Sequence, residues 1–265
     1  MKNLLTIAGS DSSGGAGIQA DLKTFAAHKT YGMSVITAVT AQNTMGVLGV
    51  QNISPRTIQQ QLQAVFEDVL VDGVKIGMLS TATIIRTVAR SLTQYQPKIM
   101  VLDPVMVSKS GHNLLDPKAV QILIKELLPL AMVVTPNIPE AEVITSQEIR
   151  TRKDMETAAK DICCMGAKYV LLKGGHGSGA ADDVLYDSIN DRCTWFGAER
   201  VNTIHTHGTG CSLSSAIAAN LANGMPIEEA VAEAKKYVLV GIKHGLAIGG
   251  GHGPIHHFVE MWKDR

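Results

Sequence analysis

The sequence carries no excess charge of either sign, because 24 lysines and arginines balance 24 aspartates and glutamates. It also lacks a basic run, so its net charge would attract neither a nucleic acid nor an anionic membrane. No stretch approaches the ~20 apolar residues that cross a bilayer. Ser10 and Asp11 interrupt the apolar start too early for a signal peptide. We therefore expect a cytoplasmic protein whose partner is a small molecule.

Cysteine is scarce, and its spacing excludes two further classes of protein. The sequence contains no Cys-x-x-Cys pair among Cys163, Cys164, Cys193 and Cys211. This spacing argues against a structural zinc site, and it gives no disulfide framework in a chain of 265 residues. A chain of this length can bury a sizeable hydrophobic core instead.

Two common nucleotide-binding patterns are missing or incomplete. No glycine-rich loop ends in Gly-Lys-Ser or Gly-Lys-Thr, so there is no Walker A loop. Gly15-Ala16-Gly17 follows an apolar run, as in a dinucleotide-binding fold, but that fold needs an acidic residue at the end of its second strand. The second run ends in Thr40-Ala41-Gln42 instead, which disfavours a dehydrogenase.

Apolar runs of strand length alternate with helical patterns along the chain. The runs cover residues 4–8, 34–39, 74–79, 98–105, 131–135 and 169–172. Such alternation predicts an α/β fold in which a mostly parallel sheet is covered by helices on both faces. Between residues 174 and 201 the pattern changes to small residues and short runs, which predict a hairpin region. Because no linker or repeat interrupts the chain, we expect a single domain over residues 1–265.

Helix signals separate these runs. A capping residue followed by proline marks the start of two helices, at Ser54-Pro55 and Asp116-Pro117. We expect helices from about residues 55, 117, 155, 209 and 226, the third of them ending near Gly166, and a short final helix after Pro254. The glycine-rich stretch 249–253 is either a plain connector, which we favour, or the hinge of a lid.

The segment Thr206-His207-Gly208-Thr209-Gly210-Cys211-Ser212 joins two glycines to the start of one of these helices. Glycines let the backbone turn tightly and approach a ligand. The first N–H groups of a helix have no partner within the helix and lie at the positive end of its dipole. The segment therefore predicts a phosphate site, with an ordinary glycine turn before a core helix as the alternative.

Polar residues gather where the strand-like runs end. In a parallel sheet these ends share one edge, and ligands bind there. Asp103 and Glu140 offer hard oxygens of the kind that Mg²⁺ accepts, and Lys173 can hold a phosphate as a point charge. Each residue taken alone has a capping or turn role as an alternative. Their joint occurrence indicates a binding site. The other polar residues at these ends are Ser10, Asp11, Ser12, Ser13, Gln42, Asn43 and Asn137.

Seven segments carry a family resemblance. They are residues 9–23, 37–44 and 75–79, Asp103-Pro104-Val105-Met106, Thr135-Pro136-Asn137, Lys173-Gly174-Gly175-His176 and Thr206-His207-Gly208-Thr209-Gly210-Cys211. In this order they resemble the hydroxymethylpyrimidine and phosphomethylpyrimidine kinases of thiamine biosynthesis, over nearly the whole chain. The resemblance implies a ribokinase-like three-layer α/β/α sandwich that forms a homodimer. It further implies that ATP and Mg²⁺ are used to phosphorylate 4-amino-5-hydroxymethyl-2-methylpyrimidine and then its monophosphate.

The resemblance also implies roles for individual residues. The carboxamide of Gln42 would bind the pyrimidine, because it can donate and accept hydrogen bonds at once. The implied substrate-binding residues are Gly9, Asp21, Gln42, Met78 and Val105. The implied ATP-binding residues are Asn137, Lys173, Thr206, Gly208 and Gly210. The implied Mg²⁺ ligands are Asp103 and Glu140, and the implied catalytic residues are Gly208, Thr209, Gly210 and Cys211.

Cys211 stands where ribokinase-like enzymes commonly have an aspartate general base, although the pyrimidine kinases are similar to this sequence in having cysteine. A helix N-terminus lowers the pKa of a thiol from its usual ~8.5, whereas adjacent ATP phosphates would raise it again. A phosphate monoester, by contrast, is already anionic at neutral pH. We therefore hypothesise that Cys211 assists the hydroxyl in the first phosphorylation and that the second needs no protein base.

Two alternative functions remain. A pyridoxine or pyridoxal kinase would share the fold and act on another hydroxymethyl-bearing ring, although Gln42 favours the pyrimidine. A non-catalytic nucleotide-binding protein would use the same glycine segment. The joint presence of four residues argues against that second alternative: Asp103, Glu140, Lys173 and Cys211.

Overall fold

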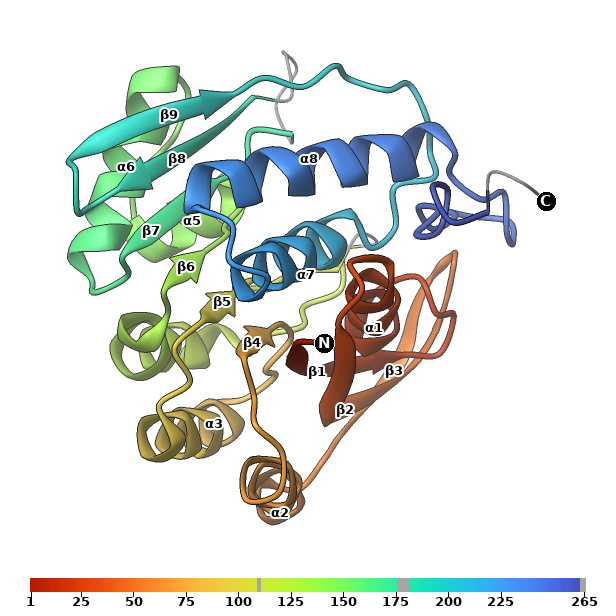
Figure 1. Cartoon of the computed structure of the whole chain (residues 1–265), viewed down its shortest axis with the longest axis vertical. Helices are drawn as coiled ribbons and strands as arrows, with labels where there is room; N and C mark the ends of the chain where they lie inside the picture. Colours follow the sequence, from red (N-terminus) through yellow and green to blue (C-terminus); the bar gives the residue numbers. More distant parts are fainter. Residues whose placement is uncertain (109–110, 176–181, 263–265) are drawn as a thin grey trace.

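The computed structural model describes residues 1–108, 111–175 and 182–262, so His176 lies outside the described residues. Strands and helices alternate along the chain (Figure 1). The strands are β1 (Asn3–Asp11), β2 (Tyr31–Asn43), β3 (Gly46–Asn52), β4 (Gly73–Ile76), β5 (Met100–Leu102), β6 (Val133–Val134), β7 (Tyr169–Leu172), β8 (Asp183–Asp187) and β9 (Arg192–Phe196). The α-helices are α1 (Gly17–Ala27), α2 (Pro55–Phe66), α3 (Ala82–Tyr95), α4 (Val120–Ile122), α5 (Ile138–Thr145), α6 (Arg152–Cys164), α7 (Thr209–Ala222) and α8 (Ile227–Lys243).

The strands of the described chain form one nine-stranded sheet in the order β3-β2-β1-β4-β5-β6-β7-β8-β9. The strands from β2 across to β7 pair in parallel. Antiparallel pairings attach β3 at one edge and the β8–β9 hairpin at the other. The mostly parallel sheet is confirmed, and the hairpin falls within the stretch where the sequence changes character.

Helices cover both faces of the sheet, which gives the three-layer sandwich (Figure 1). Alternate residues of β1 enter opposite layers, as the two-residue period of a strand requires. Leu5 and Ile7 join the core beneath α2, α3, α5 and α6. Leu4 joins the core beneath α1, α7 and α8, where it meets Phe25 and Ala216. The sheet therefore lies between two helical layers, each with its own core.

The predicted helix starts are present, but one segment is irregular. Ser54 caps α2 by accepting a hydrogen bond from Thr57 N at 3.1 Å, and Asp116 accepts one from Lys118 N at 3.0 Å. The chain after Asp116 does not continue as one α-helix. It passes through η1 (Pro117–Ala119), α4, the π-helix η2 (Leu123–Leu127) and η3 (Leu128–Leu130). Pro129 offers a reason, because proline lacks an N–H donor and its ring crowds the carbonyl four residues earlier.

Two features differ from the sequence-based expectations. The prediction of a short final helix is wrong, because the described chain after Pro254 ends in turns. There Met261 N and Trp262 N both donate to Phe258 O at 3.0 Å. The expectation also missed β3, an edge strand without an alternating buried face, in which Leu48 is 82% exposed. No helix in the described part of the chain is both long and apolar enough to cross a membrane.

Candidate active site

A cavity of about 880 Å³ lies at the carboxyl ends of the parallel strands, under the N-terminus of α7. Gln42 and Cys211 both line it, so the candidate ring-binding residue and the glycine segment open into one space. Its volume is at the upper end of the range for ligand pockets, ~300–1,000 Å³. The residues from the sequence-based predictions that line it are Gly9, Gln42, Met78, Asp103, Val105, Asn137, Glu140, Lys173, Thr206, Gly208, Thr209, Gly210 and Cys211.

The glycine segment forms a tight turn, which we call the anion turn (residues 208–211), at the start of α7. Gly208 has φ +81°, and α7 has no side-chain cap. A Cβ atom at Gly208 would lie 1.8 Å from the carbonyl oxygen of Gly15, so a larger residue cannot occupy this position. Thr209 N donates to Thr206 O at 3.3 Å, and Gly210 and Cys211, in the first turn of α7, line the cavity. The first N–H groups of a helix have no partner within the helix, which is the arrangement that binds phosphate.

Lys173 brings a positive charge next to this turn. Its Nζ donates to Asp103 Oδ1 at 3.0 Å and lies 3.6 Å from the position that a Cβ atom of Gly210 would occupy. The Asp103 carboxylate also accepts a hydrogen bond from Thr135 Oγ1 at 3.2 Å. Burial would raise the pKa of Asp103, but Lys173 and Lys75 hold it below its usual value, so the carboxylate is ionised.

Glu140 lines the same cavity and also caps the N-terminus of α5. It is the third residue of α5, where its Oε2 accepts from Asn137 N and its own N–H donates to Asn137 Oδ1, both at 2.9 Å. This reciprocal pair is a capping box. Burial raises the pKa of Glu140 to about 7, and the neighbouring charge of Asp103 acts in the same direction.

The chemistry of these two carboxylates fits a magnesium ion. Both are buried, at 2% exposure for Asp103 and 6% for Glu140, and each raises the energetic cost of charging the other. A divalent cation would relieve that repulsion. In the described residues there is no cluster of three His, Cys, Asp or Glu that could hold a metal alone. This agrees with the way Mg²⁺ is usually bound, by one or two carboxylates together with substrate phosphates.

Cys211 lines the cavity above a buried ion pair. Lys75 Nζ donates to Asp21 Oδ1 at 2.8 Å, and both side chains are fully buried. Asp21 also accepts from Thr6 Oγ1 at 2.6 Å and from Ser215 Oγ at 2.7 Å. Burial raises the pKa of Cys211 to about 11, although the charge of Lys75 opposes that effect. The thiol is therefore neutral at physiological pH.

Asp21 does not line the cavity, unlike the other residues implied to bind substrate. Its carboxylate is 0% exposed and is engaged by Lys75, Thr6 and Ser215 below the cavity floor. The structure therefore does not support a direct contact between Asp21 and substrate. Lys75, which does line the cavity, is the group through which Asp21 can act on a ligand.

The opposite end of the cavity combines Gln42 with apolar side chains. A β-bulge separates the pairs Ala41–Gly49 and Gln42–Val47, and bulges next to binding sites often redirect a side chain. Met78 is 8% exposed, and its Sδ lies 3.0 Å from the position that a Cβ atom of Gly9 would occupy. A glycine at residue 9 therefore leaves room for Met78 at the cavity wall.

His207 lies next to Gln42 and directly precedes the anion turn. The sequence-based prediction of the site did not include this residue. Its Nε2 lies 2.8 Å from Asp11 Oδ2, 196 residues away in sequence. The backbone of His207 is held by the C-terminal segment: His207 N donates to Gly253 O at 3.1 Å, and Ile255 N donates to His207 O at 3.3 Å. In the sequence, the signal that could have assigned His207 to the site is its position directly before Gly208.

The glycines of residues 249–253 have a packing role. A Cβ atom at Gly251 would lie 2.2 Å from Thr44 O, and one at Gly253 would lie 2.0 Å from Leu246 O. His252 N also donates to Thr44 O at 2.9 Å. These contacts fasten the C-terminal segment beside the end of β2, so close backbone approach explains the glycines.

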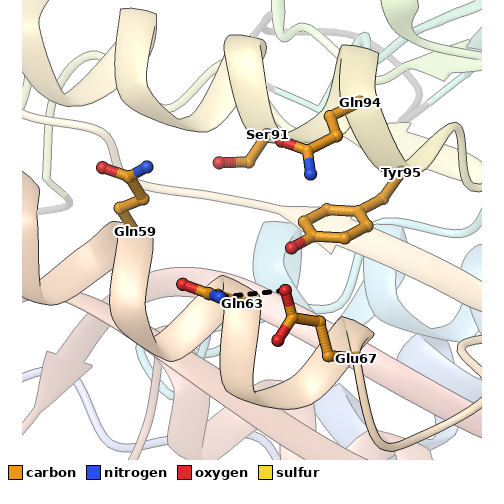
Figure 2. A pocket seen from close by; sticks show the side chains of 6 residues that line it. All are labelled: Gln59, Gln63, Glu67, Ser91, Gln94 and Tyr95. Atoms are coloured by element: carbon orange, nitrogen blue, oxygen red, sulfur yellow. Dashed lines mark hydrogen bonds between the residues drawn. The ribbon is translucent and has the colours of Figure 1, made fainter.

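A second, smaller cavity of about 210 Å³ lies between α2 and α3 (Figure 2). None of the candidate site residues lines it. Its wall is polar, and Gln63 Nε2 donates to Glu67 Oε1 at 2.9 Å on the α2 side of the cavity. The lining residues are Gln59, Gln63, Glu67, Ser91, Gln94 and Tyr95. The cavity lies on the outer layer and not at the strand ends.

The anion turn, the adjacent lysine and the buried carboxylates, set at the strand ends of an α/β/α sandwich, define a phosphotransferase of the ribokinase-like class. The comparison with known families makes the assignment specific. The family model described as phosphomethylpyrimidine kinase matches residues 11–256, and the chain belongs to this family.

Individual relatives agree with the family assignment. The hydroxymethylpyrimidine/phosphomethylpyrimidine kinase of Rhizobium meliloti (strain 1021) is 51% identical over 98% of each chain. The solved phosphomethylpyrimidine kinase of Clostridium difficile 630 has 50% identity and a TM-score of 0.81, covering 90% of this chain and 98% of that one. An ADP complex of Bacillus subtilis pyridoxal kinase has 40% identity and a TM-score of 0.91, covering 98% and 99%.

One relative is longer than this chain. The thiamine biosynthesis bifunctional protein ThiED of Geobacter sulfurreducens is 49% identical over 99% of this chain, which spans only 54% of that protein.

Proposed function

We propose that this kinase transfers a phosphoryl group from ATP to 4-amino-5-hydroxymethyl-2-methylpyrimidine and then to the resulting monophosphate, in thiamine biosynthesis. The observation that carries the proposal is the single cavity shared by Gln42 and the anion turn. Relatives of nearly the same length bear the name of this activity at 51% and 48% identity. The site residues and their roles below are part of the proposal.

The phosphate groups of ATP would bind between the anion turn and Lys173. Backbone N–H groups at the start of α7 would hold the phosphate oxygens, and Lys173 would add a fixed positive charge from the other side. Asn137 and Thr206 also line the cavity and would contact the nucleotide. In phosphoryl transfer, positioning and charge stabilisation supply most of the catalysis, so these groups are the principal catalytic elements.

Asp103 and Glu140 would hold Mg²⁺, which when bound neutralises charge on the transferring phosphate. Their role in the protein is then to offer two oxygens from separate strand ends. Ionisation of Glu140 would accompany binding, because the free carboxylate has a pKa of about 7. Lys173 would be released from part of its interaction with Asp103 and could turn to the phosphates.

In the first transfer, the hydroxymethyl oxygen of the substrate attacks the γ-phosphorus of ATP. The bond between the γ-phosphorus and the bridging oxygen breaks, and ADP leaves with that oxygen. The hydroxyl proton passes to an oxygen of the transferred phosphoryl group. Cys211 would orient the attacking hydroxyl, while its neutral thiol makes it a poor proton acceptor. In the second transfer the attacking oxygen belongs to a phosphate that is already anionic. No proton then has to be removed.

A pyridoxal kinase activity is the alternative function. It is favoured by the backbone match to the ADP complex of the Bacillus subtilis pyridoxal kinase, with a TM-score of 0.91. Gln42 argues for the aminopyrimidine, since a pyridine alcohol lacks the adjacent amine and ring nitrogen that a carboxamide can bind together.

An ATP-dependent assay with purified protein tests the proposal directly. The pyrimidine alcohol, its monophosphate and pyridoxal are compared under identical conditions. We expect the first two to have the higher kcat/KM. A preference for pyridoxal would replace the proposal with the alternative, and the absence of ATP turnover with all three would refute both.

We also propose that the chain is a single domain over residues 1–265 and acts as a cytoplasmic homodimer. Supporting the single domain, one sheet joins strands from Asn3 to Phe196. Supporting the dimer, the β2–β3 edge exposes apolar side chains, with Leu48 82% and Tyr31 57% exposed. Sedimentation of the wild type and of Leu48→Glu tests the dimer, and a monomeric wild type would exclude it.

A further inference from the structure

The main chain of Gln42 is held in place by hydrogen bonds to the Ser12 side chain. Ser12 Oγ donates to Gln42 O at 2.7 Å, and Gln42 N donates to Ser12 Oγ at 2.8 Å. These two bonds fix the main chain at the β-bulge where the side chain enters the cavity. The remaining freedom of Gln42 is therefore in the side chain, above all in the half-turn that exchanges its carboxamide oxygen and nitrogen.

Asp11 determines which atom of His207 carries a proton. Its carboxylate accepts hydrogen bonds from Ser13 N, Gly15 N and Ala16 N at 2.8, 3.1 and 2.8 Å. Burial would raise the pKa of Asp11, but the hydrogen bonds from His207, Ser13 and Ala16 hold it well below its usual value. An ionised carboxylate can only accept. Nε2 of His207, 2.8 Å away, must therefore carry a hydrogen and donate it to Asp11.

The donor at His207 in turn determines the direction of the Gln42 carboxamide. In the structure Gln42 Nε2 lies 3.3 Å from His207 Nε2. A nitrogen that already carries a hydrogen cannot accept from an NH₂ group, so two donors would face each other. With its oxygen at this position, Gln42 accepts a share of the same hydrogen that His207 gives to Asp11.

Thr40, which contacts the other carboxamide atom of Gln42, favours the same orientation. A hydroxyl has one hydrogen, and Thr40 Oγ1 lies 2.9 Å from Ser10 O, which can only accept. In the structure the second carboxamide atom is Gln42 Oε1, 3.1 Å from Thr40 Oγ1, so one hydroxyl hydrogen faces two acceptors. The half-turn that exchanges the carboxamide oxygen and nitrogen removes this conflict, because an NH₂ group at the same position donates to a lone pair of the hydroxyl. Exchanging the two carboxamide atoms, so that the oxygen faces His207 and the nitrogen faces Thr40, therefore satisfies both neighbours at once.

We propose that Asp11 and His207, together with Thr40, are positioning residues that fix the direction of the Gln42 carboxamide and thereby the orientation of the substrate ring. This inference rests on the proposed function and deepens it. One oxygen lone pair and one amide hydrogen of Gln42 remain for a ligand. The exocyclic amine of an aminopyrimidine donates to the oxygen, and the adjacent ring nitrogen accepts from the NH₂ group.

The direction of the carboxamide decides where the reactive group lies. In this binding mode the exocyclic amine is on the His207 side. The hydroxymethyl group is attached to the ring carbon next to the amine-bearing carbon, so it lies on the same side. His207 directly precedes Gly208, so this is also the side of the anion turn. A reversed carboxamide would turn the ring over and place the hydroxymethyl group on the Thr40 side, away from the transferring phosphate.

A pair of ring analogues tests the inference. The 4-oxo analogue of the pyrimidine alcohol has a carbonyl in place of the amine and an N–H in place of the ring nitrogen, so its donor and acceptor are exchanged. Binding is measured calorimetrically without ATP, and kcat/KM is measured with it. We expect wild type to bind the amino compound at least about tenfold more tightly, because the oxo compound leaves polar groups unpaired.

Substitutions that free the carboxamide should reduce this preference. In Thr40→Val the NH₂ group loses its acceptor, and in His207→Phe the oxygen loses its donor. We expect the ratio of the two dissociation constants to fall severalfold in each and to approach one in the double variant. Thr40→Ser, which keeps the hydroxyl, is the matched control and should keep the wild-type ratio. Thr40→Val lies outside the anion turn, so it separates ring selection from damage to that turn.

The outcomes separate this inference from the proposed function. Wild type that does not discriminate between the analogues in binding refutes the inference, whatever its turnover. A preference that survives unchanged in the double variant also refutes it, even if kcat falls. Wild type that selects the amino compound in binding but does not phosphorylate it refutes the proposed function and leaves the oriented carboxamide supported.

Discussion

Replacing Cys211 with alanine should affect the two phosphoryl transfers unequally. With a pKa of about 11, the thiol is ionised in only ~1 in 1,000 to 1 in 10,000 molecules at pH 7 to 8. A general base contributes ~10²–10⁴-fold to a rate, and a group so rarely ionised supplies little of that. We expect Cys211→Ala to lower kcat for the hydroxymethyl substrate by about tenfold and kcat for the monophosphate by less than about threefold.

The assay follows ADP release with each pyrimidine supplied separately at saturating ATP. Cys211→Ser is the matched control, because it keeps a small polar side chain at the start of α7 and should retain most of the first activity. The pH profile of the wild type should show no ionisation of Cys211 between pH 6 and 9. Losses of ~100-fold or more in both steps would refute this reasoning, since they would require the thiol to act as a base in each.

Three further substitutions test other parts of the structure. Lys75→Met leaves the buried Asp21 carboxylate without its cationic partner and should lower the free energy of unfolding, measured by chemical denaturation, by ~3–5 kcal/mol. Adding Asp21→Asn should recover part of this loss. Gly208→Ala should weaken ATP binding and lower the melting temperature, since its Cβ would lie 1.8 Å from Gly15 O, whereas Gly224→Ala, with φ +95° and no atom within 4 Å, should show only the smaller backbone effect. Burial lowers the pKa of His257 to about 4, so its protonation favours the unfolded chain; stability should be lost as the pH falls from 6.5 to 4, by up to ~3 kcal/mol, and His257→Gln should remove that part of the pH dependence. An unaltered profile in His257→Gln would contradict the assignment.

The sequence was sufficient for features that depend on local chemistry. Ser54 and Pro55 start α2 because a cap and a first-turn proline act within a few residues of the chain. The parallel arrangement followed from alternating apolar runs and helices, and parallel strands necessarily place their carboxyl ends at one edge. For that reason Gln42, Asp103 and Lys173 were expected to lie together, and all three line one cavity.

Features that depend on distant contacts could not be predicted in the same way. The partner of His207 is Asp11, 196 residues away, and no local pattern joins them. Asp21 was assigned to the substrate because it lies in a family segment, but its place within α1 turns the side chain toward Lys75 and away from the cavity. The edge strand β3 carries no alternating apolar face, so its pairing with β2 supplies the information that its composition lacks.

The position of the C-terminal segment has a consequence for biosynthesis of the active molecule. All strands of the sheet precede Gly197, yet the backbone of His207 is held by Gly253 and Ile255. In a nascent chain the strands therefore emerge from the ribosome before α7 and α8, which cover one face of the sheet, and before the segment that supports the substrate side. Premature termination shortly before Gly253 would remove the support for the ring-selecting histidine together with Ile255, which is fully buried.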